Sequence, residues 1–237
     1  MKKSLDKYIG AQMKYWQVQK HSISEADEKK KAERHFITIS REYGCSGFSI
    51  GKEITEIMNG TAEKPEPLWA AYERQVLDRV MEDMGISSFL AKTMTDDAQR
   101  NMTNVIKSTF SKLPPQVAVY QKLAETIRLL AANGNVVIVG RAANVITRGM
   151  TGGYHVMIIA PMEYKITNVM NLKNVSKKEA EKLVVENTKR RVNYIKEYVN
   201  FDVNDYHNYD LVINLSNYSV AGAANLIIEG MKLQGSH

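Results

Sequence analysis

Residues 40–53 read SREYGCSGFSIGKE, and the interpretation of the rest of the chain depends on this stretch. The stretch directly follows HFITIS (35–40), with which it shares Ser40. HFITIS is a short run with β-branched residues, which predicts a buried strand. After the glycines, Ile50, Ile54 and Ile57 recur at helical spacing. The sequence therefore predicts a strand, a glycine-rich turn and a helix in direct succession.

The glycine-rich turn has the composition of a phosphate-binding loop. Such a loop needs backbone N–H groups that converge on an anion at a helix N-terminus, and glycine permits the backbone angles this requires. The stretch nevertheless fails the Walker A rule, because Lys52 is followed by Glu53 and the glycine spacing differs. Lys52 also lies more than a turn beyond the candidate donors, so we expect its ammonium to point elsewhere. The candidate donors are Gly44, Cys45, Ser46, Gly47, Phe48 and Ser49.

Spacing alone leaves two interpretations of the turn equally open: a phosphate site or a structural strand-to-helix turn. Cys45 has no neighbouring histidine or acid that indicates nucleophilic catalysis, so we interpret it as a small loop residue. Its position at a predicted helix N-terminus is one where thiol pKa values tend to fall.

Buried strands and helices alternate along the remaining sequence. Further strands are predicted at PLWAAY (67–72), NVVIVG (135–140), YHVMIIA (154–160) and YDLVINLS (209–216). Helices are predicted over 73–85, 86–110 and 119–134, from the capping box SKKE (176–179) to about Tyr198, and from Val220 onward. This alternation indicates an α/β fold: a parallel sheet with helices on both faces, which binds ligands at the C-terminal ends of its strands.

Residues 1–34 are predicted to form a separate helical extension and charged linker, ahead of one domain over 35–237. Leu5, Ile9, Met13 and Trp16 form a narrow apolar stripe at helical spacing. We expect this stripe to pack on the main domain or on a second subunit, which would make the protein a homodimer.

Composition narrows the function classes. The net charge of +6 favours an anionic partner. The sequence contains no long basic stripe interleaved with aromatic residues, so nucleic acid is not the expected partner. Cys45 is the single cysteine, so no intrachain disulfide can form, and a reducing compartment fits. No window approaches the roughly 18 apolar residues of a membrane span, and the N-terminus lacks the apolar core of a signal peptide. We therefore expect a cytoplasmic protein without membrane contact.

Three motifs carry a resemblance to a known family. ITISREYGCSGFSIGKEI, NVVIVGRAANVI and KRRVNYIKEYV followed by NYDLVIN resemble, in this order, the cytidylate-kinase-like proteins, which are P-loop relatives of the nucleoside monophosphate kinases. The resemblance runs from about Ile37 to Ile228. It implies a three-layer P-loop NTPase-type fold with a helical lid, ATP and Mg²⁺ as cofactors, and a CMP-like nucleoside monophosphate or another small phosphorylated acceptor.

In the loop, the resemblance assigns Gly44 to the first glycine of the kinase motif and Ser46 to the second. Ser49 matches the threonine and is the candidate Mg²⁺ ligand. Gly47 stands where the loop lysine would be, and Phe48 stands where relatives usually carry arginine. The loop thus lacks the cation that normally lies near the transferred phosphate.

Arg41, at the exit of the first strand, is the nearest substitute cation; the alternative is a structural salt bridge with Glu42 or another carboxylate. The Gly-Arg pair that ends in Arg141 resembles one that contacts the acceptor phosphate in cytidylate kinases. Arg191 matches the acceptor-binding arginine of the lid, and Arg190 is a further lid candidate. Guanidinium groups bind phosphate oxygens bidentately and stay charged. The candidate catalytic residues are therefore Arg41, Arg141, Arg190 and Arg191.

The substrate-binding candidates are more varied. Lys189 belongs to the basic lid segment, for which a solvated helix face is the alternative. Thr188 replaces an aspartate that helps to recognise the nucleoside in cytidylate kinases, so cytidine specificity does not carry over. Tyr72 and Glu73 match a Tyr-Asp pair of the acceptor region, but Glu73 could equally be a helix N-terminal carboxylate. Tyrosines 194, 198, 206 and 209 are interpreted as packing residues.

Two functions follow. The chain is either a nucleotide-dependent phosphotransferase or a non-catalytic P-loop module that senses a nucleotide or another phosphorylated ligand. The replacements at Gly47, Phe48, Ala142 and Thr188 favour the second, and the order of the three motifs favours the first.

Overall fold

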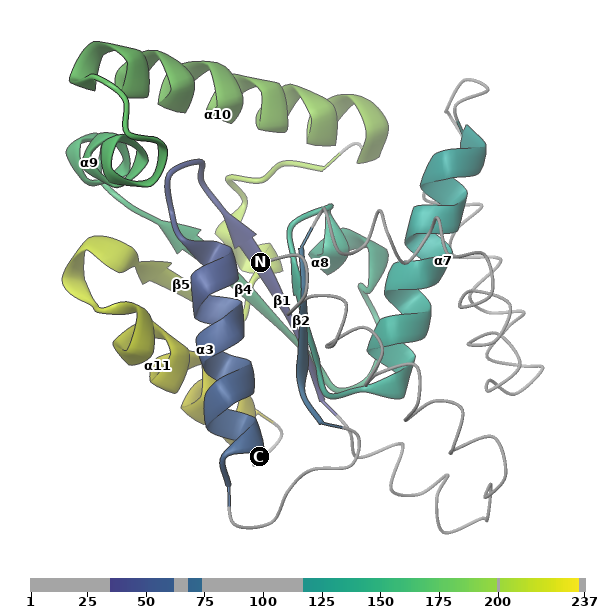
Figure 1. Cartoon of the computed structure of the whole chain (residues 1–237). Helices are drawn as coiled ribbons and strands as arrows, with labels where there is room; N and C mark the ends of the chain where they lie inside the picture. Colours follow the sequence, from purple (N-terminus) through teal and green to yellow (C-terminus); the bar gives the residue numbers. More distant parts are fainter. Residues whose placement is uncertain (1–34, 62–67, 74–116, 200, 235–237) are drawn as a thin grey trace, which may run out of the picture.

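The structure is a computed structural model that describes residues 35–61, 68–73, 117–199 and 201–234 (Figure 1). The predicted N-terminal extension, with its expected dimer contact, lies outside the described residues. So do most of the helix predicted over 73–85 and all of the one predicted over 86–110.

The described strands form one parallel sheet in the order β2-β3-β1-β4-β5. Their bounds are β1 (Phe36–Arg41), β2 (Ala70–Tyr72), β3 (Val136–Val139), β4 (Gly153–Ile159) and β5 (Leu211–Asn214). Because β1 lies at the centre, the loop that follows it faces the C-terminal ends of both neighbouring strands, where such sheets bind ligands.

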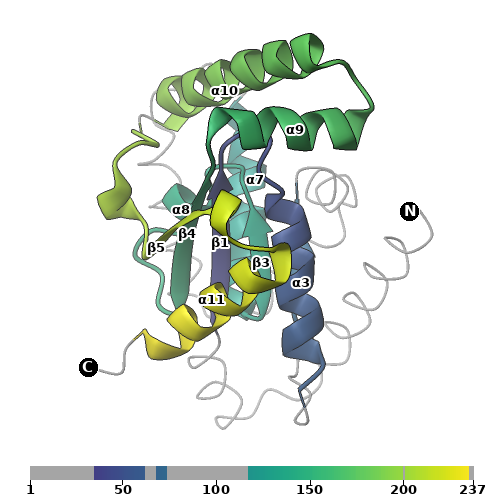
Figure 2. The same cartoon turned by 90° about the vertical axis from the view of Figure 1, so that its left-hand side faces the viewer.

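Helices cover both faces of the sheet (Figures 1 and 2). One face carries α3 (Gly47–Asn59) and α11 (Val220–Leu233), and the other carries α7 (Val117–Asn133) and the short α8 (Ala143–Ile146). The helices α9 (Met162–Lys173) and α10 (Lys177–Val199) lie across the C-terminal end of the sheet. The predicted three-layer α/β fold with a helical lid is confirmed.

Continuous apolar runs in β1 and β3 explain why these strands are central. Ile37, Ile39, Val137 and Val139 are fully buried between the sheet and α3, and each such side chain contributes about 1.5–3 kcal/mol of burial free energy. A Cβ atom on Gly51 would lie 3.3 Å from side-chain atoms of both valines. Gly51, the glycine of the apparent Gly-Lys motif, therefore lets α3 pack closely on the sheet.

The capping signals in the sequence correspond to helix ends in the structure. The hydroxyl of Ser176 accepts a hydrogen bond from the Glu179 N–H at 3.3 Å, immediately before α10. Ser219 caps α11 by accepting from the Gly222 N–H at 3.0 Å. Gly134 ends α7 with a φ of +71°, a conformation that favours glycine.

Some element bounds differ from the sequence-based expectations. The helix α3 begins at Gly47, before the isoleucine pattern that indicated it, and therefore includes half of the glycine loop. β5 ends at Asn214, where the chain enters the 3₁₀ turn η2 (Leu215–Asn217). The helix α9 was not predicted at all. Pro161, interpreted as the end of a strand, is its N-cap residue, a place where the missing proline N–H costs nothing.

No helix of the described ranges has the length and apolarity needed to cross a membrane. The longest, α10, has 23 residues but carries charged side chains along its length.

Candidate functional site

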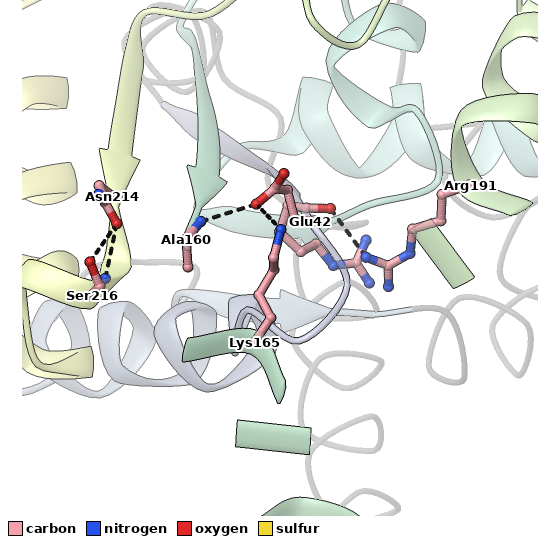
Figure 3. A network of polar contacts seen from close by, with 7 residues as sticks. Glu42, Ala160, Lys165, Arg191, Asn214 and Ser216 are labelled. Atoms are coloured by element: carbon pink, nitrogen blue, oxygen red, sulfur yellow. Dashed lines mark hydrogen bonds and ion pairs between the residues drawn. The ribbon is translucent and has the colours of Figure 1, made fainter. Parts of the chain in front are cut away.

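The loop after β1 is fastened to the helix α9. Glu42 Oε2 accepts hydrogen bonds from the Ala160 N–H at 3.0 Å and from Lys165 Nζ at 3.0 Å (Figure 3). Arg191 reaches the same segment from the other side. Glu42 pairs with Lys165, so Glu42 is not the carboxylate partner considered for Arg41; the Glu73 carboxylate is the one whose charge favours the Arg41 guanidinium.

Gly44 is the position at which this loop meets α9. Its φ is +92°, and a Cβ atom there would lie 2.8 Å from the Lys165 Cβ. The Asn168 side-chain amide donates to the Gly44 carbonyl at 2.5 Å and contacts the Ser46 hydroxyl at 2.9 Å. Glycine is thus required both by the backbone angle and by the close approach of α9.

The start of α3 keeps free donor groups. The Ser46 hydroxyl, at the N-cap position, makes no capping hydrogen bond and is held by Asn168. The amides of Cys45 and Gly47 already donate to the carbonyls of Glu42 (3.3 Å) and Cys45 (2.8 Å). The N–H groups of Phe48 and Ser49 lie in the first turn of α3 and have no side-chain cap, which suits an anion at this helix end.

The side chains of Phe48 and Lys52 do not point to a role in phosphate binding. Phe48 packs against the main core, and Lys52 is exposed to solvent, as its distance from the loop predicted. Burial raises the pKa of the Cys45 thiol to about 12, with a further contribution from the Glu42 carboxylate. The expected lowering by the helix N-terminus was wrong, because burial outweighs the helix dipole, and the thiol is protonated at neutral pH.

A cavity of about 410 Å³ lies beside the glycine loop, at the C-terminal ends of β1 and β3. Its walls come from these strand ends, from α8, from α10 and from the segment between α10 and β5. This volume lies within the range of about 300–1,000 Å³ that is typical of small-molecule sites. None of the six loop residues Gly44 to Ser49 lines it.

Three arginines meet at this cavity: Arg41 from β1, Arg141 after β3, and Arg191 from α10. Arg191 Nη1 donates to the Arg41 carbonyl at 3.1 Å, and its guanidinium lies 5.4 Å from the centre of the Tyr43 ring. Burial and then the charge of Arg191 lower the pKa of Arg41, with Arg141 adding to the effect and Glu73 opposing it. The cavity thus brings three guanidinium groups together at the ends of β1 and β3 and beside α10.

The backbone that carries Arg141 is strained. Gly140, Arg141 and Ala142 have φ values of +78°, +58° and +53°, and two of these residues are not glycine. Each such non-glycine residue costs on the order of 1 kcal/mol, and these conformations cluster at functional sites. A Cβ atom on Gly140 would overlap Arg41 Nη1, so this glycine makes room for the Arg41 guanidinium.

The structure brings some of the predicted site residues together and leaves others apart. Arg41, Arg141, Thr188, Arg190 and Arg191 all line the cavity. Lys189 is exposed and does not line the cavity. Glu73 does not line the cavity either, but its negative charge raises the pKa of Arg41. Tyr72 is buried in the sheet at 2% exposure.

The cavity residues that were not predicted include several polar ones: Ser40, Asn144, Asn204, Tyr206 and Tyr209. Tyr206 and Tyr209 were interpreted as packing residues, and their arrival at the cavity depends on how the segment after α10 folds back. Ser40 could have been found, because it directly precedes Arg41 at a strand end.

Within the described residues, no group of three or more histidine, cysteine, aspartate or glutamate side chains could hold a metal ion. Ser49, exposed in the first turn of α3, offers one oxygen ligand. A single protein oxygen suits Mg²⁺, which usually keeps several waters and binds substrate phosphates as well.

A parallel sheet of this order, with a glycine loop after its central strand and helices across the C-terminal end of the sheet, is consistent with a P-loop NTPase-type fold. A family model described as the cytidylate kinase-like family matches residues 36–217, and the chain belongs to this family. A cytidylate kinase of Methanocaldococcus jannaschii (strain ATCC 43067 / DSM 2661 / JAL-1 / JCM 10045 / NBRC 100440) is 31% identical over 100 residues. That match covers 41% of this chain and 56% of the relative's length.

The fold is also similar to a solved structure, that of an uncharacterized protein from Eubacterium ventriosum ATCC 27560. The TM-score is 0.65 at 22% sequence identity, and the match covers 85% of this chain and 99% of the other. This likeness supports the fold.

Proposed function

We propose that the protein is an ATP-dependent phosphotransferase that acts on a CMP-like nucleoside monophosphate or another small phosphorylated acceptor. The observation that carries this proposal is the convergence of Arg41, Arg141 and Arg191 on one cavity at the C-terminal ends of the central strands. Membership of the cytidylate kinase-like family supports the reaction class.

The acceptor phosphate binds between the three arginines. Guanidinium groups brought together without a ligand repel one another, and a phosphate dianion would turn that repulsion into attraction. Glu42, a carboxylate at the cavity wall, is already paired with Lys165 and does not compensate the arginines. Arg190, exposed on α10, adds a fourth cation at the cavity rim.

The phosphates of ATP bind at the start of α3, where the N–H groups of Phe48 and Ser49 have no side-chain cap. Ser49 would supply one oxygen to Mg²⁺, which when bound neutralises charge on the donor phosphates. Arg41 lies next to this loop and lines the acceptor cavity, so it is placed to stabilise charge between the two phosphates.

An assay of ADP release tests the proposal, with saturating ATP and Mg²⁺ and a panel of AMP, CMP, GMP and UMP. We expect turnover with at least one monophosphate, and a loss of about hundredfold in kcat/KM in Arg141→Met. Arg148→Met serves as control, because Arg148 is exposed and does not line the cavity. Absence of turnover above background with all four acceptors would contradict the proposal.

A second candidate is a non-catalytic module that binds a phosphorylated ligand. It is favoured by the closed form of the glycine loop, in which Gly44 lies against Lys165 and Asn168 holds the Gly44 carbonyl. Calorimetric titration separates the two: binding of a monophosphate without ADP release supports the module, and turnover excludes it.

The Thr188 side chain provides a test of the ligand site that is independent of charge. Its hydroxyl is buried and has no hydrogen-bond partner among the described residues, although the residue lines the cavity. Thr188→Val should leave the unfolding free energy unchanged or raise it by up to about 1 kcal/mol, because an unpaired polar group is removed. If the hydroxyl binds the ligand, the same variant loses about threefold to tenfold in monophosphate affinity.

Thermal unfolding and calorimetry of the purified variant provide both measurements. A fall in stability would show that the hydroxyl has a structural partner, and unchanged affinity would remove Thr188 from the ligand site.

A further inference from the structure

Besides the arginines, the cavity carries a cluster of uncharged polar side chains from three separate parts of the chain. Ser40 is the last residue but one of β1, Asn144 lies in α8, and Tyr209 lies two residues before β5. Ser40 Oγ donates to Asn144 Oδ1 at 3.3 Å, and the Tyr209 hydroxyl lies beside the side chains of both. We call these three residues the Ser40–Asn144–Tyr209 cluster.

The segment that positions Tyr209 is held by its own hydrogen bonds. Asp205 accepts from the His207 N–H at 3.2 Å and from Asn208 Nδ2 at 2.8 Å, and the Tyr209 hydroxyl donates to the Val203 carbonyl at 3.4 Å. Figure 2 shows this segment between α10 and β5, passing beside α8. Tyr209 is therefore presented to the cavity by a locally ordered turn.

The hydrogen bonds that the two hydroxyl groups of the cluster donate are long. Bonds between two oxygen atoms usually span about 2.5–3.0 Å, whereas the bond from Ser40 to Asn144 measures 3.3 Å and the bond from Tyr209 to the Val203 carbonyl, outside the cluster, measures 3.4 Å. Burial raises the pKa of Tyr209, so its phenol keeps its proton at neutral pH. The hydrogen bonds that the two hydroxyl groups donate are thus weak. Each hydroxyl group can rotate to donate to a closer acceptor on a bound molecule.

The polar groups of the cavity are divided by charge. The cations Arg41, Arg141, Arg190 and Arg191 belong to the strand ends and to α10, while the Ser40–Asn144–Tyr209 cluster is neutral. A ligand whose phosphate binds the arginines would therefore place its uncharged part against the cluster. Apolar side chains that also line the cavity, such as Met157 and Ile195, suit the face of a flat ring.

We propose that the Ser40–Asn144–Tyr209 cluster determines specificity by hydrogen-bonding the uncharged edge of the nucleoside whose phosphate is held by the arginines. This inference rests on the proposed function, because it assumes a nucleoside monophosphate in the cavity. It assigns to Ser40, Asn144 and Tyr209 a role distinct from phosphate binding: the arginines supply affinity for any phosphate, and the cluster distinguishes what is attached to it.

The test compares two probes on the full chain by calorimetry: inorganic phosphate, and whichever of AMP, CMP, GMP and UMP binds the wild type most tightly. Tyr209→Phe removes the hydroxyl alone. We expect it to weaken monophosphate binding by about threefold to tenfold while phosphate binding changes by less than about twofold. Tyr218→Phe is the matched control, because Tyr218 is exposed and does not line the cavity. If Tyr209→Phe does not fold, Ser40→Ala takes its place with the same expectation.

Each outcome decides the inference. A loss confined to the monophosphate supports it. An equal loss for both probes, or no loss for either, overturns it, because the hydroxyl would then act only through the fold or not at all. Failure of the wild type to bind any of the four monophosphates would instead contradict the proposed function, which the wild-type titrations alone reveal.

Discussion

Replacing Arg41 with methionine is expected to stabilise the ligand-free protein and, at the same time, to weaken monophosphate binding by about hundredfold. The two effects have opposite signs because the guanidinium is unfavourable in the empty cavity and favourable with a phosphate in it. Removing it should raise the melting temperature by about 2–4 °C for each kcal/mol gained, as is usual for chains of this size.

The stabilisation follows from the surroundings of Arg41. Burial and the charges of Arg191 and Arg141 lower its pKa, while Glu73 and, to a smaller extent, Cys45 oppose this shift. Because arginine stays protonated at neutral pH, the lowered pKa reflects an unfavourable charge. Methionine keeps an unbranched apolar side chain for the packing against Gly47 and Gly140.

Thermal unfolding with and without the bound monophosphate tests both effects: the higher melting temperature of the ligand-free variant and its weaker binding of the monophosphate. Arg148→Met is the control, since it removes the same charge from an exposed position outside the cavity and should change neither quantity. A lower melting temperature for ligand-free Arg41→Met would show that Arg41 has a structural role.

Gly140→Ala is expected to destabilise the protein by about 2 kcal/mol and to reduce monophosphate affinity at least about tenfold. The backbone term arises from the φ of +78°, which disfavours any side chain. The second term is specific to this place: the new methyl group would overlap Arg41 Nη1, so the guanidinium has to move out of its position at the cavity.

The variant Gly149→Ala separates the backbone cost from the effect of displacing the Arg41 guanidinium. Gly149 has nearly the same φ, +76°, but a Cβ atom there would meet nothing within 4 Å. It should cost about 1–2 kcal/mol from the backbone alone and leave monophosphate affinity unchanged. Denaturant unfolding and calorimetry of both variants provide the comparison; equal affinity for the two variants would mean that the Arg41 position does not matter for binding.

The fold was largely predictable because its strands are short, apolar and separated by clear helical patterns. β3 and β4 were located to within one or two residues, and the starts of α10 and α11 were correct. The helix α9 escaped prediction because Met162–Lys173 has no pronounced apolar stripe: within it, Lys165, Ile166 and Val169 are the buried residues. The strength of a helical pattern depends on how much of a helix is buried, and α9 contacts mainly the loop and α10.

The arginines of the site were predictable because each follows a strand end or lies on the lid helix. The positive φ values of Arg141 and Ala142 were not, since no local sequence signal demands them. The neutral side of the cavity also escaped prediction. Asn144 and Tyr209 are 65 residues apart in the numbering of the chain, and their contact depends on the tertiary arrangement of α8 and the segment before β5.

The hydrogen bond from Arg191 to the Arg41 carbonyl has one more consequence. Every amino acid offers the same carbonyl group at position 41, so this hydrogen bond between α10 and the end of β1 does not depend on which side chain is present there. Residue 41, and with it the chemistry of the cavity, could therefore change during evolution while this contact of α10 is kept. Relatives that differ at this position are expected to share the lid arrangement while differing in the ligands they accept.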